Sequence, residues 1–211
     1  MGLEHYIPQL EFYYQNPRPK KLSQILRQLD KNGVLNYADN RLMIAAFLSE
    51  LARKGKVDLK SLAPANAKIN LRHTLLWSAR LAGEKAYSLL SPALITDRDK
   101  TLASQLEHVP YSLRDWRLEP AVVRMYVAAF MASGDEIWIE ALIDAALLQN
   151  SSVAAASRAI LFDSASRHRP IRERLEKRAN SAAGDEKEIL TLILSGTKNP
   201  NKAGNPRIAP F

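Results

Sequence analysis

The sequence contains no cysteine, and this absence excludes several kinds of chemistry at once. Without thiols there is no disulfide framework, no cysteine nucleophile, no iron–sulfur cluster and no cysteine-based zinc site. The chain also lacks a Walker loop, a G-x-G-x-x-G fingerprint, a nucleophile elbow and an H-E-x-x-H motif. Because the histidines are far apart in sequence, they form no local ligand set. We therefore expect no cofactor and no bound metal.

The sequence also has no long apolar run. Uncharged stretches such as Tyr87–Thr96 and Met125–Gly134 fall short of the roughly 18 apolar residues that cross a bilayer. The first residues contain neither the basic region nor the apolar run of a secretory signal. We therefore expect no membrane span and a cytoplasmic protein. The alternative is a periplasmic or secreted protein from which a leader has been removed.

Residues that favour strands are scarce. Leucine and alanine dominate the composition, valine and threonine are few, and no stretch alternates apolar and polar residues with β-branched enrichment. With 46% hydrophobic and 25% charged residues, the 211-residue chain has the composition of a folded globular protein. We therefore predict an all-α fold.

The clearest helix pair is predicted between residues 19 and 54. Pro19 is suited to the first turn of a helix, and apolar residues recur at helical spacing after it until Gly33. Asn36 is predicted to cap the next helix. That helix carries seven consecutive apolar residues, Leu42–Leu48, which cover all of its faces. We therefore expect its middle to be buried on every side.

The same pattern returns in the second half of the chain. An apolar helix is predicted to end at Gly134, and Asp135 is positioned to cap the helix that follows. This next helix carries an acidic stripe at i, i+4 and i+8, formed by Glu136, Glu140 and Asp144. The helices predicted in this half span residues 120–133, 136–148, 152–167, 170–180 and 185–196.

The middle of the chain, residues 57–119, is predicted to form shorter helices over 71–82, 84–90 and 97–107. Pro64 and Pro92 are the expected helix breakers. Asp97–Asp99 is expected to form a solvated helix start, and Ser112 is positioned to cap a short turn.

Amphipathic helices that alternate with wholly apolar ones are typical of stacked antiparallel helix pairs, because each inner helix is covered on both sides. In architecture the chain resembles the α-solenoids, which include tetratricopeptide-like and HEAT-like helical repeats, with an irregular helical bundle as the alternative. The tetratricopeptide spacing itself is not met: Leu76, Trp77 and Tyr87 have suitable residue types at other offsets. The stretch Phe130–Asp135, followed two helices later by Arg167–Pro170, is similar to bacterial all-helical proteins.

Residues 1–196 are predicted to form a single all-helical domain. Residues 197–211 contain three prolines and no helical period, and we predict an extended C-terminal tail. If this tail is ordered, something must hold it. We expect Ile208 or Phe211 to dock in an apolar groove.

Positive charge is concentrated in one segment. The formal net charge is +8, yet residues 120–149 sum to −3 and residues 150–184 sum to +4. The basic segment suggests a face for phosphates, nucleic acid or an acidic partner. Its charges also recur at i, i+4, which predicts a solvated helix with surface ion pairs. The candidate binding residues in this segment are Arg167, Arg169, Arg172 and Arg174.

Most aromatic residues lie in apolar helices and are expected in the core. Tyr13, Tyr14 and Trp116 lie outside these helices, and they are the aromatic candidates for an exposed binding surface.

Arg124 is the only charged residue in the apolar helix predicted over 120–133. A buried guanidinium without a partner is costly, so two outcomes are expected. It pairs across the hairpin with Asp144 or Glu140, or it opens onto a wet cleft that binds a carboxylate or phosphate.

No residue pattern in the chain indicates catalysis. The only local Ser/His/Asp grouping, Asp163–His168, is expected to be a polar helix end, because catalytic triads are assembled from separated elements. Stacked helix pairs are typical of proteins that present an extended surface to a partner. We therefore predict a non-enzymatic helical-repeat protein that binds another protein or peptide. The alternatives are nucleic-acid or polyanion binding through Arg167–Arg178, and an enzyme with a site assembled from distant residues.

Overall fold

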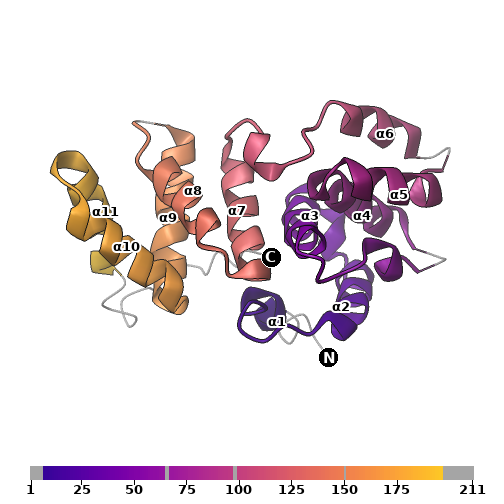
Figure 1. The fold of residues 1–211 in the computed structure, drawn as a ribbon, viewed down its shortest axis with the longest axis horizontal. Coiled ribbons are helices and arrows are strands. Elements are labelled where there is room, and N and C mark those ends of the chain that lie inside the picture. The colour runs from indigo at the N-terminus through magenta and orange to yellow at the C-terminus, as the bar shows by residue number, and fades with distance from the viewer. Residues whose placement is uncertain (1–6, 65–66, 97–98, 150, 197–211) are drawn as a thin grey trace. The chain divides into compact units, whose positions relative to one another are not determined.

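The computed structural model describes residues 7–64, 67–96, 99–149 and 151–196 (Figure 1). This part of the chain forms α-helices and 3-10 turns and contains no strand, so the predicted all-α class is confirmed. The packing of the helices is compatible with a bundle or a solenoid. The contacts divide the described chain into two compact units, residues 7–117 with 128–134 and residues 118–127 with 135–196, each described by itself below.

The helices of the first unit are α1 (Ile7–Glu11), α2 (Pro19–Lys31), α3 (Ala38–Arg53), α4 (Ile69–Ala82), α5 (Glu84–Leu94) and α6 (Lys100–Glu107). Its 3-10 turns are η2 (Val34–Asn36), η3 (Leu59–Leu62) and η5 (Leu113–Asp115). The last residues of α7 (Pro120–Ser133) also belong to this unit. The helices predicted over 19–33 and 71–82 correspond to α2 and α4 within a few residues.

Helix α3 forms the centre of the first unit. Every residue from Met43 to Leu51 is buried, as the apolar run predicts. The broadest contact of α3 is with α4. The rings of Tyr13 and Phe47 meet edge to face with centroids 5.2 Å apart, so the segment after α1 also packs on α3.

Helices α3 and α4 begin side by side. The Asn70 side chain donates a hydrogen bond to the Asn36 side-chain oxygen at 2.9 Å, which places the start of α4 beside the turn that precedes α3. The turn η3 lies between α3 and α4 in the chain.

Two helix boundaries predicted in this unit were wrong. Asn36 does not cap α3: it ends η2, and α3 begins at Ala38 without a side-chain cap. Pro92 does not break a helix either, since α5 continues through it to Leu94. Proline lacks the backbone N–H but still fits helical dihedrals, so neighbouring contacts can retain it near the end of a helix.

The glycine predicted to end α7 is required for two reasons. Gly134 has a φ of 71°, and a Cβ atom there would lie 3.1 Å from the Tyr14 ring. The next residue, Asp135, accepts a hydrogen bond from the Ile137 N–H at 3.3 Å and so caps the following helix, as predicted.

The helices of the second unit are the first residues of α7, then α8 (Glu136–Ala146), α9 (Ser152–Arg167), α10 (Arg169–Ser181) and α11 (Gly184–Gly196). Helix α8 ends two residues before the predicted boundary, whereas α9 matches its prediction residue for residue. The Ser157 hydroxyl donates to the Leu142 carbonyl at 2.6 Å and joins α9 to α8. Helix α10 packs on α8 and α9, and α11 packs on α9 and α10.

None of the helices in the described ranges combines the length and the apolar character needed to cross a membrane. The predicted docking of Ile208 or Phe211 falls on residues 197–211, which lie outside the described residues. The single domain predicted over 1–196 stays a prediction, which the cooperativity of unfolding would test.

Candidate functional site

Two of the ion pairs that the i, i+4 spacing predicts along α10 are present. Arg169 pairs with Glu173 at 2.6 Å, and Arg172 pairs with Glu176 at 3.6 Å, both at i, i+4. The side chain of Arg169 is 86% exposed, so water and salt screen its pair, which contributes little to stability. These pairs occupy two of the four arginines that were the candidates for a basic binding face.

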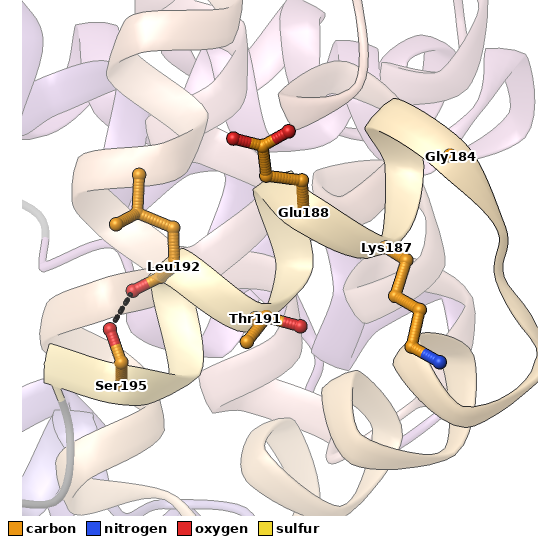
Figure 2. Close-up of a pocket in the computed structure, with 6 residues that line it drawn as sticks. All are labelled: Gly184, Lys187, Glu188, Thr191, Leu192 and Ser195. Carbon is orange, nitrogen blue, oxygen red and sulfur yellow. Dashed lines mark hydrogen bonds between the residues drawn. The ribbon is translucent and has the colours of Figure 1, made fainter.

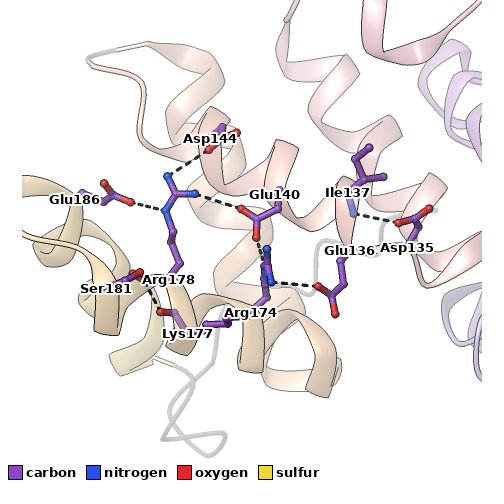
Figure 3. Close-up of polar contacts among 10 residues, drawn as sticks. All are labelled: Asp135, Glu136, Ile137, Glu140, Asp144, Arg174, Lys177, Arg178, Ser181 and Glu186. Carbon is purple, nitrogen blue, oxygen red and sulfur yellow. Dashed lines mark hydrogen bonds and ion pairs between the residues drawn. The ribbon is translucent and has the colours of Figure 1, made fainter.

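A larger ion-pair cluster joins three helices of the second unit (Figure 3). Its arginines lie on α10 and its carboxylates on α8 and α11. The members of the ion-pair cluster are Arg174, Arg178, Glu136, Glu140, Asp144 and Glu186. Both arginines contact Glu140, which is the centre of the cluster. Arg178 also pairs with Asp144 at 3.6 Å and with Glu186 at 2.6 Å, and its hydrogen bond to Glu186 raises its pKa.

The ion-pair cluster brings the acidic stripe of α8 against the basic segment of α10. Both charge patterns are visible in the sequence, but their pairing depends on the packing of α10 against α8. Because several carboxylates surround two guanidinium groups, the positive potential of this segment is reduced. The arrangement stabilises the packing of helices and leaves less charge for a phosphate-bearing ligand.

Arg124 is half-buried on α7. Its two predicted partners, Glu140 and Asp144, are members of the ion-pair cluster and contact Arg178. The pairing of Arg124 with either carboxylate stays a prediction, as does the alternative of a wet cleft.

Two of the three candidate aromatic residues pack within the first unit. Tyr13 is 2% exposed, and burial raises the pKa of its phenol to about 12. Tyr14 is half-buried, its N–H donates to the Met131 carbonyl at 2.9 Å, and its ring lies 4.9 Å from that of Phe130. The expectation of an exposed Tyr13 is corrected, because the segment after α1 folds onto α3 and α7.

The third aromatic candidate, Trp116, stacks on Trp77 of α4. The two rings are nearly parallel, at 4°, with centroids 5.4 Å apart, and both side chains are half-buried. One face of Trp116 is therefore occupied by a ring of the same chain and is not open to a base or a peptide.

Asp99 is fully buried, which corrects the expectation of a solvated helix start. Arg72 donates to both of its carboxylate oxygens at 3.1 Å, and His73 Nε2 lies 2.9 Å from Oδ1. The backbone N–H of Thr96 donates at 3.0 Å and its hydroxyl at 2.5 Å. Residues 97 and 98 lie outside the described residues.

Burial alone would raise the pKa of the Asp99 carboxyl, but the hydrogen bonds from Thr96, Arg72 and His73 outweigh it and hold that pKa well below its usual range. A carboxylate offers about four lone-pair sites, and the contacts just described use all of them. Asp99 is therefore a structural anion that joins the loop before α6 to α4, and it has no acceptor position left for a ligand.

Arg80, in the last turn of α4, also joins a loop to this helix. It is 7% exposed and donates to the carbonyls of Val109 at 2.7 Å and Glu107 at 2.9 Å. Its guanidinium lies over two tyrosine rings, 3.6 Å from the centroid of Tyr111 and 5.3 Å from that of Tyr87. This arginine holds the loop after α6 against α4.

The Ser/His/Asp grouping at the end of α9 is divided between surface and interior. His168 and Ser164 are buried, which corrects the expected polar helix end. Asp163 pairs with Arg167, and the Ser166 hydroxyl donates to the Asp163 carbonyl at 2.7 Å. Within the part of the chain that the structure describes, no group of three His, Asp or Glu side chains is placed to hold a metal ion.

Helix α9 also carries an uncharged face that the sequence does not indicate. Its exposed members are Ser152, Ala155, Ala159, Phe162 and Ser166. They recur at helical spacing on the side opposite the buried residues of α9. Phe162 is the only large side chain among them and is 42% exposed. Because α9 is rich in alanine on every side, its sequence shows no apolar periodicity that would single out this face.

Charged side chains flank the uncharged face of α9, and their partners lie within the chain. Arg158 donates to the carbonyls of Ala146 at 2.7 Å and Leu148 at 3.4 Å, and so holds the end of α8. On the other flank, Arg167 pairs with Asp163. The face is therefore an uncharged strip between two charged edges.

Comparison with known proteins assigns no family to this arrangement. No family model, no curated protein and no solved structure matches the chain.

Proposed function

We propose that this protein is a non-enzymatic helical scaffold that binds another protein or a peptide through the uncharged face of α9. The supporting observation is the exposure of Phe162, 42%, within a face that carries no charge from Ser152 to Ser166. The cores of protein interfaces are depleted in charged residues, enriched in aromatic ones and surrounded by a polar rim. The face and its flanks have this composition.

We also propose that the second unit is a short helical repeat of the α-solenoid type. Helices α8 and α9 form one pair, and α10 and α11 form the next, which packs on the first. Such stacks use their extended surfaces for binding, and this supports a scaffold role. The relation to particular repeat families, tetratricopeptide-like or HEAT-like, is part of this proposal.

The chemistry of the face favours an apolar partner. Ala155 and Ala159 are small and exposed, so a partner helix can approach the backbone of α9 closely. Phe162 projects beside them and fits an apolar pocket on that partner. Because the face is uncharged, binding should change little with salt concentration, unlike binding to a nucleic acid.

The test is site-specific photocrosslinking in the cell that produces the protein. A photoreactive phenylalanine analogue replaces Phe162, and a matched chain carries it at Tyr37, which is 69% exposed and lies in the first unit. We expect a discrete crosslinked partner at position 162 and none at position 37. Equal crosslinking at both positions, or none at either, would overturn the proposal.

The partner identified in this way is then measured with purified proteins. Phe162→Lys should weaken its binding by about tenfold or more, as expected for an interface anchor, whereas Tyr37→Lys should leave it within about twofold. Affinity that falls steeply with salt and is insensitive to Phe162→Lys would instead support the polyanion alternative through Arg167–Arg178.

A further inference from the structure

The most exposed aromatic side chain of the described residues lies in the first unit. Tyr37, the residue before α3, is 69% exposed, and Ile69, the first residue of α4, is 43% exposed. The hydrogen bond between the side chains of Asn36 and Asn70 joins the residues next to them in the chain, so Tyr37 and Ile69 lie near each other. One end of this unit therefore presents an aromatic and an aliphatic side chain to solvent.

Basic side chains lie at the same end. Lys31 is the last residue of α2, Lys68 directly precedes α4, and the turn η2 contacts both helices. Lys31 and Lys68 are exposed, and neither pairs with a carboxylate of the described chain. Arg41 of α3 donates to the carbonyls of Leu35 and Asn36, at 2.7 and 3.0 Å, and so adds a third positive charge.

Acidic residues offset only part of this charge. The last turn of α2 contains Asp30, and the first turn of α3 contains Asp39, where the helix dipole favours a negative charge. Residues 7–117 contain 18 basic and 10 acidic side chains, whereas residues 118–196 contain 9 basic and 11 acidic ones. The positive potential of the first unit therefore attracts an anionic surface from a distance.

We propose that this end of the first unit binds the surface of an anionic lipid bilayer. The members of this Tyr37 surface are Tyr37, Ile69, Lys31 and Lys68. A tyrosine ring suits the headgroup level of a bilayer, because its body is apolar and its hydroxyl reaches water. The two lysines supply the charge that anionic headgroups attract.

The aliphatic member of the Tyr37 surface favours a membrane over a single-stranded nucleic acid. Proteins that bind single strands present aromatic rings on which successive bases stack. Tyr37 provides one such ring, but Ile69 offers no flat face to a base. The transfer of an aliphatic side chain from water to lipid is favourable, so both members contribute when the partner is a bilayer.

Binding to lipid and binding to a protein through the uncharged face of α9 can each occur without the other, because they use different residues. Lipids form no discrete protein adduct. Position 37 therefore remains a suitable control for photocrosslinking at position 162.

The test is flotation of the full-length protein with lipid vesicles at physiological salt. One set of vesicles contains about one-third phosphatidylserine in phosphatidylcholine, and the other contains phosphatidylcholine alone. We expect the wild type to float with the anionic vesicles and to remain unbound with the neutral ones.

The first variant removes the apolar members of the Tyr37 surface. Tyr37→Ser with Ile69→Ser should weaken binding to anionic vesicles by about tenfold or more. The matched variant, Leu89→Ser with Leu192→Ser, removes two leucines that are 67% and 71% exposed. Leu89 lies on α5, and Leu192 lies on α11 beside Glu188 (Figure 2), so binding should stay within about twofold.

The second variant removes charge. Lys31→Gln with Lys68→Gln should weaken binding by about tenfold, because both lysines lie close to the headgroups. Lys20→Gln with Lys21→Gln makes the same change in net charge at the other end of α2, about 15 Å away at 1.5 Å per residue. That distance exceeds the screening length of about 8 Å, so the control should lose less than about threefold.

Three results would overturn the proposal. The first is a wild type that does not float with anionic vesicles, or that floats equally well with neutral ones. The second is an equal loss of binding in a variant and its matched control. The third is binding of a single-stranded oligonucleotide that depends on Tyr37 in a protein that does not bind vesicles, which would make nucleic acid the partner.

Discussion

The two units use arginine in different ways. In the first unit, Arg72 binds the buried Asp99 carboxylate, and the buried Arg80 binds the carbonyls of Glu107 and Val109 at the end of α6. In the second unit, Arg174 and Arg178 bind carboxylates at the surface, and the central one, Glu140, is 25% exposed.

This difference determines how much each arrangement contributes to the free energy of unfolding. A buried charge that loses its partner leaves an uncompensated charge in a region of low dielectric constant, which is strongly destabilising. A surface pair exchanges its partner for water at little cost, and salt screens it. The two units should therefore respond differently to the same kind of substitution, and the expected effects form a series from Asp99 to Arg169.

The largest effect is expected for Asp99→Asn. The substitution keeps the shape of the side chain but removes the charge opposite Arg72 and His73, both of which are about one-fifth exposed. We expect the free energy of unfolding at pH 7 to fall by about 3 kcal/mol, the lower end of the range for a broken buried pair. Urea denaturation measures this loss. The matched control is Asp115→Asn at an exposed site, which should stay within about 0.5 kcal/mol; equal losses in the two variants would contradict the structural role of Asp99.

The stabilities of the wild type and of Asp99→Asn are also expected to depend differently on pH. In the unfolded chain Asp99 titrates near the ordinary value of about 3.9, whereas its pKa in the folded state is lower. The stabilisation is therefore complete above about pH 4 and is lost progressively as the pH falls below that value. The difference in stability between the wild type and Asp99→Asn should narrow from pH 4 downwards. A constant difference would show that the carboxylate is not preferentially ionised in the folded state.

The second effect is expected for Arg80→Met, which retains the apolar stem and removes the guanidinium. The carbonyls of Glu107 and Val109 lose their donor and Tyr111 loses the stacked cation, so we expect a loss of about 2 kcal/mol. Arg80→Lys should recover little of it, because one ammonium group does not bond two carbonyls and stack on a ring in the same geometry. Arg114→Met at an exposed site is the control. Full recovery by lysine would show that charge alone matters at this position.

The sequence predicts helices well where the signal is local. The apolar run of α3 predicts its burial, and Gly134 with Asp135 predicts the boundary between α7 and α8, because a left-handed glycine and a capping aspartate act within a few residues. Prediction from the sequence fails where contacts with residues distant in the chain determine the local structure. Asn36 bonds Asn70 instead of capping α3, and no local pattern contains that partner.

The candidate site was less predictable for the same reason. The charges of α8 and α10 are visible in the sequence, but Arg174 lies 34 residues from Glu140, and their contact follows from helix stacking. In the sequence Asp99 has the pattern of a solvated residue, because its partners Arg72 and His73 lie on another helix, α4. The uncharged face of α9 gives no periodic signal at all, since alanine is compatible with both a buried and an exposed side.

The third effect is expected for Glu140→Gln at the centre of the ion-pair cluster. Both Arg174 and Arg178 lose a charged partner, but each retains another carboxylate, so we expect a loss of about 1 kcal/mol at low salt. At 1 M salt, where the screening length is about 3 Å, the loss should shrink, whereas that of Asp99→Asn should not. Glu119→Gln, an exposed site outside the cluster, is the control. If the loss of stability in Glu140→Gln does not change with salt, the ion-pair cluster behaves like the buried Asp99 contacts of the first unit.

The smallest effect on stability is expected for the double variant Arg169→Gln and Arg172→Gln, because Arg169 is 86% exposed and both arginines make only i, i+4 pairs. This variant instead tests the polyanion alternative. Removing two positive charges lowers retention on heparin in any basic protein, so the matched variant is Lys20→Gln and Lys21→Gln on α2, which makes the same change in net charge at exposed sites. If carboxylates already occupy the arginines of α10, the two variants should elute at similar salt concentrations. A much larger loss of retention for the α10 variant would mean that these arginines bind the polymer in preference to their carboxylate partners, and the basic segment would then be a binding surface.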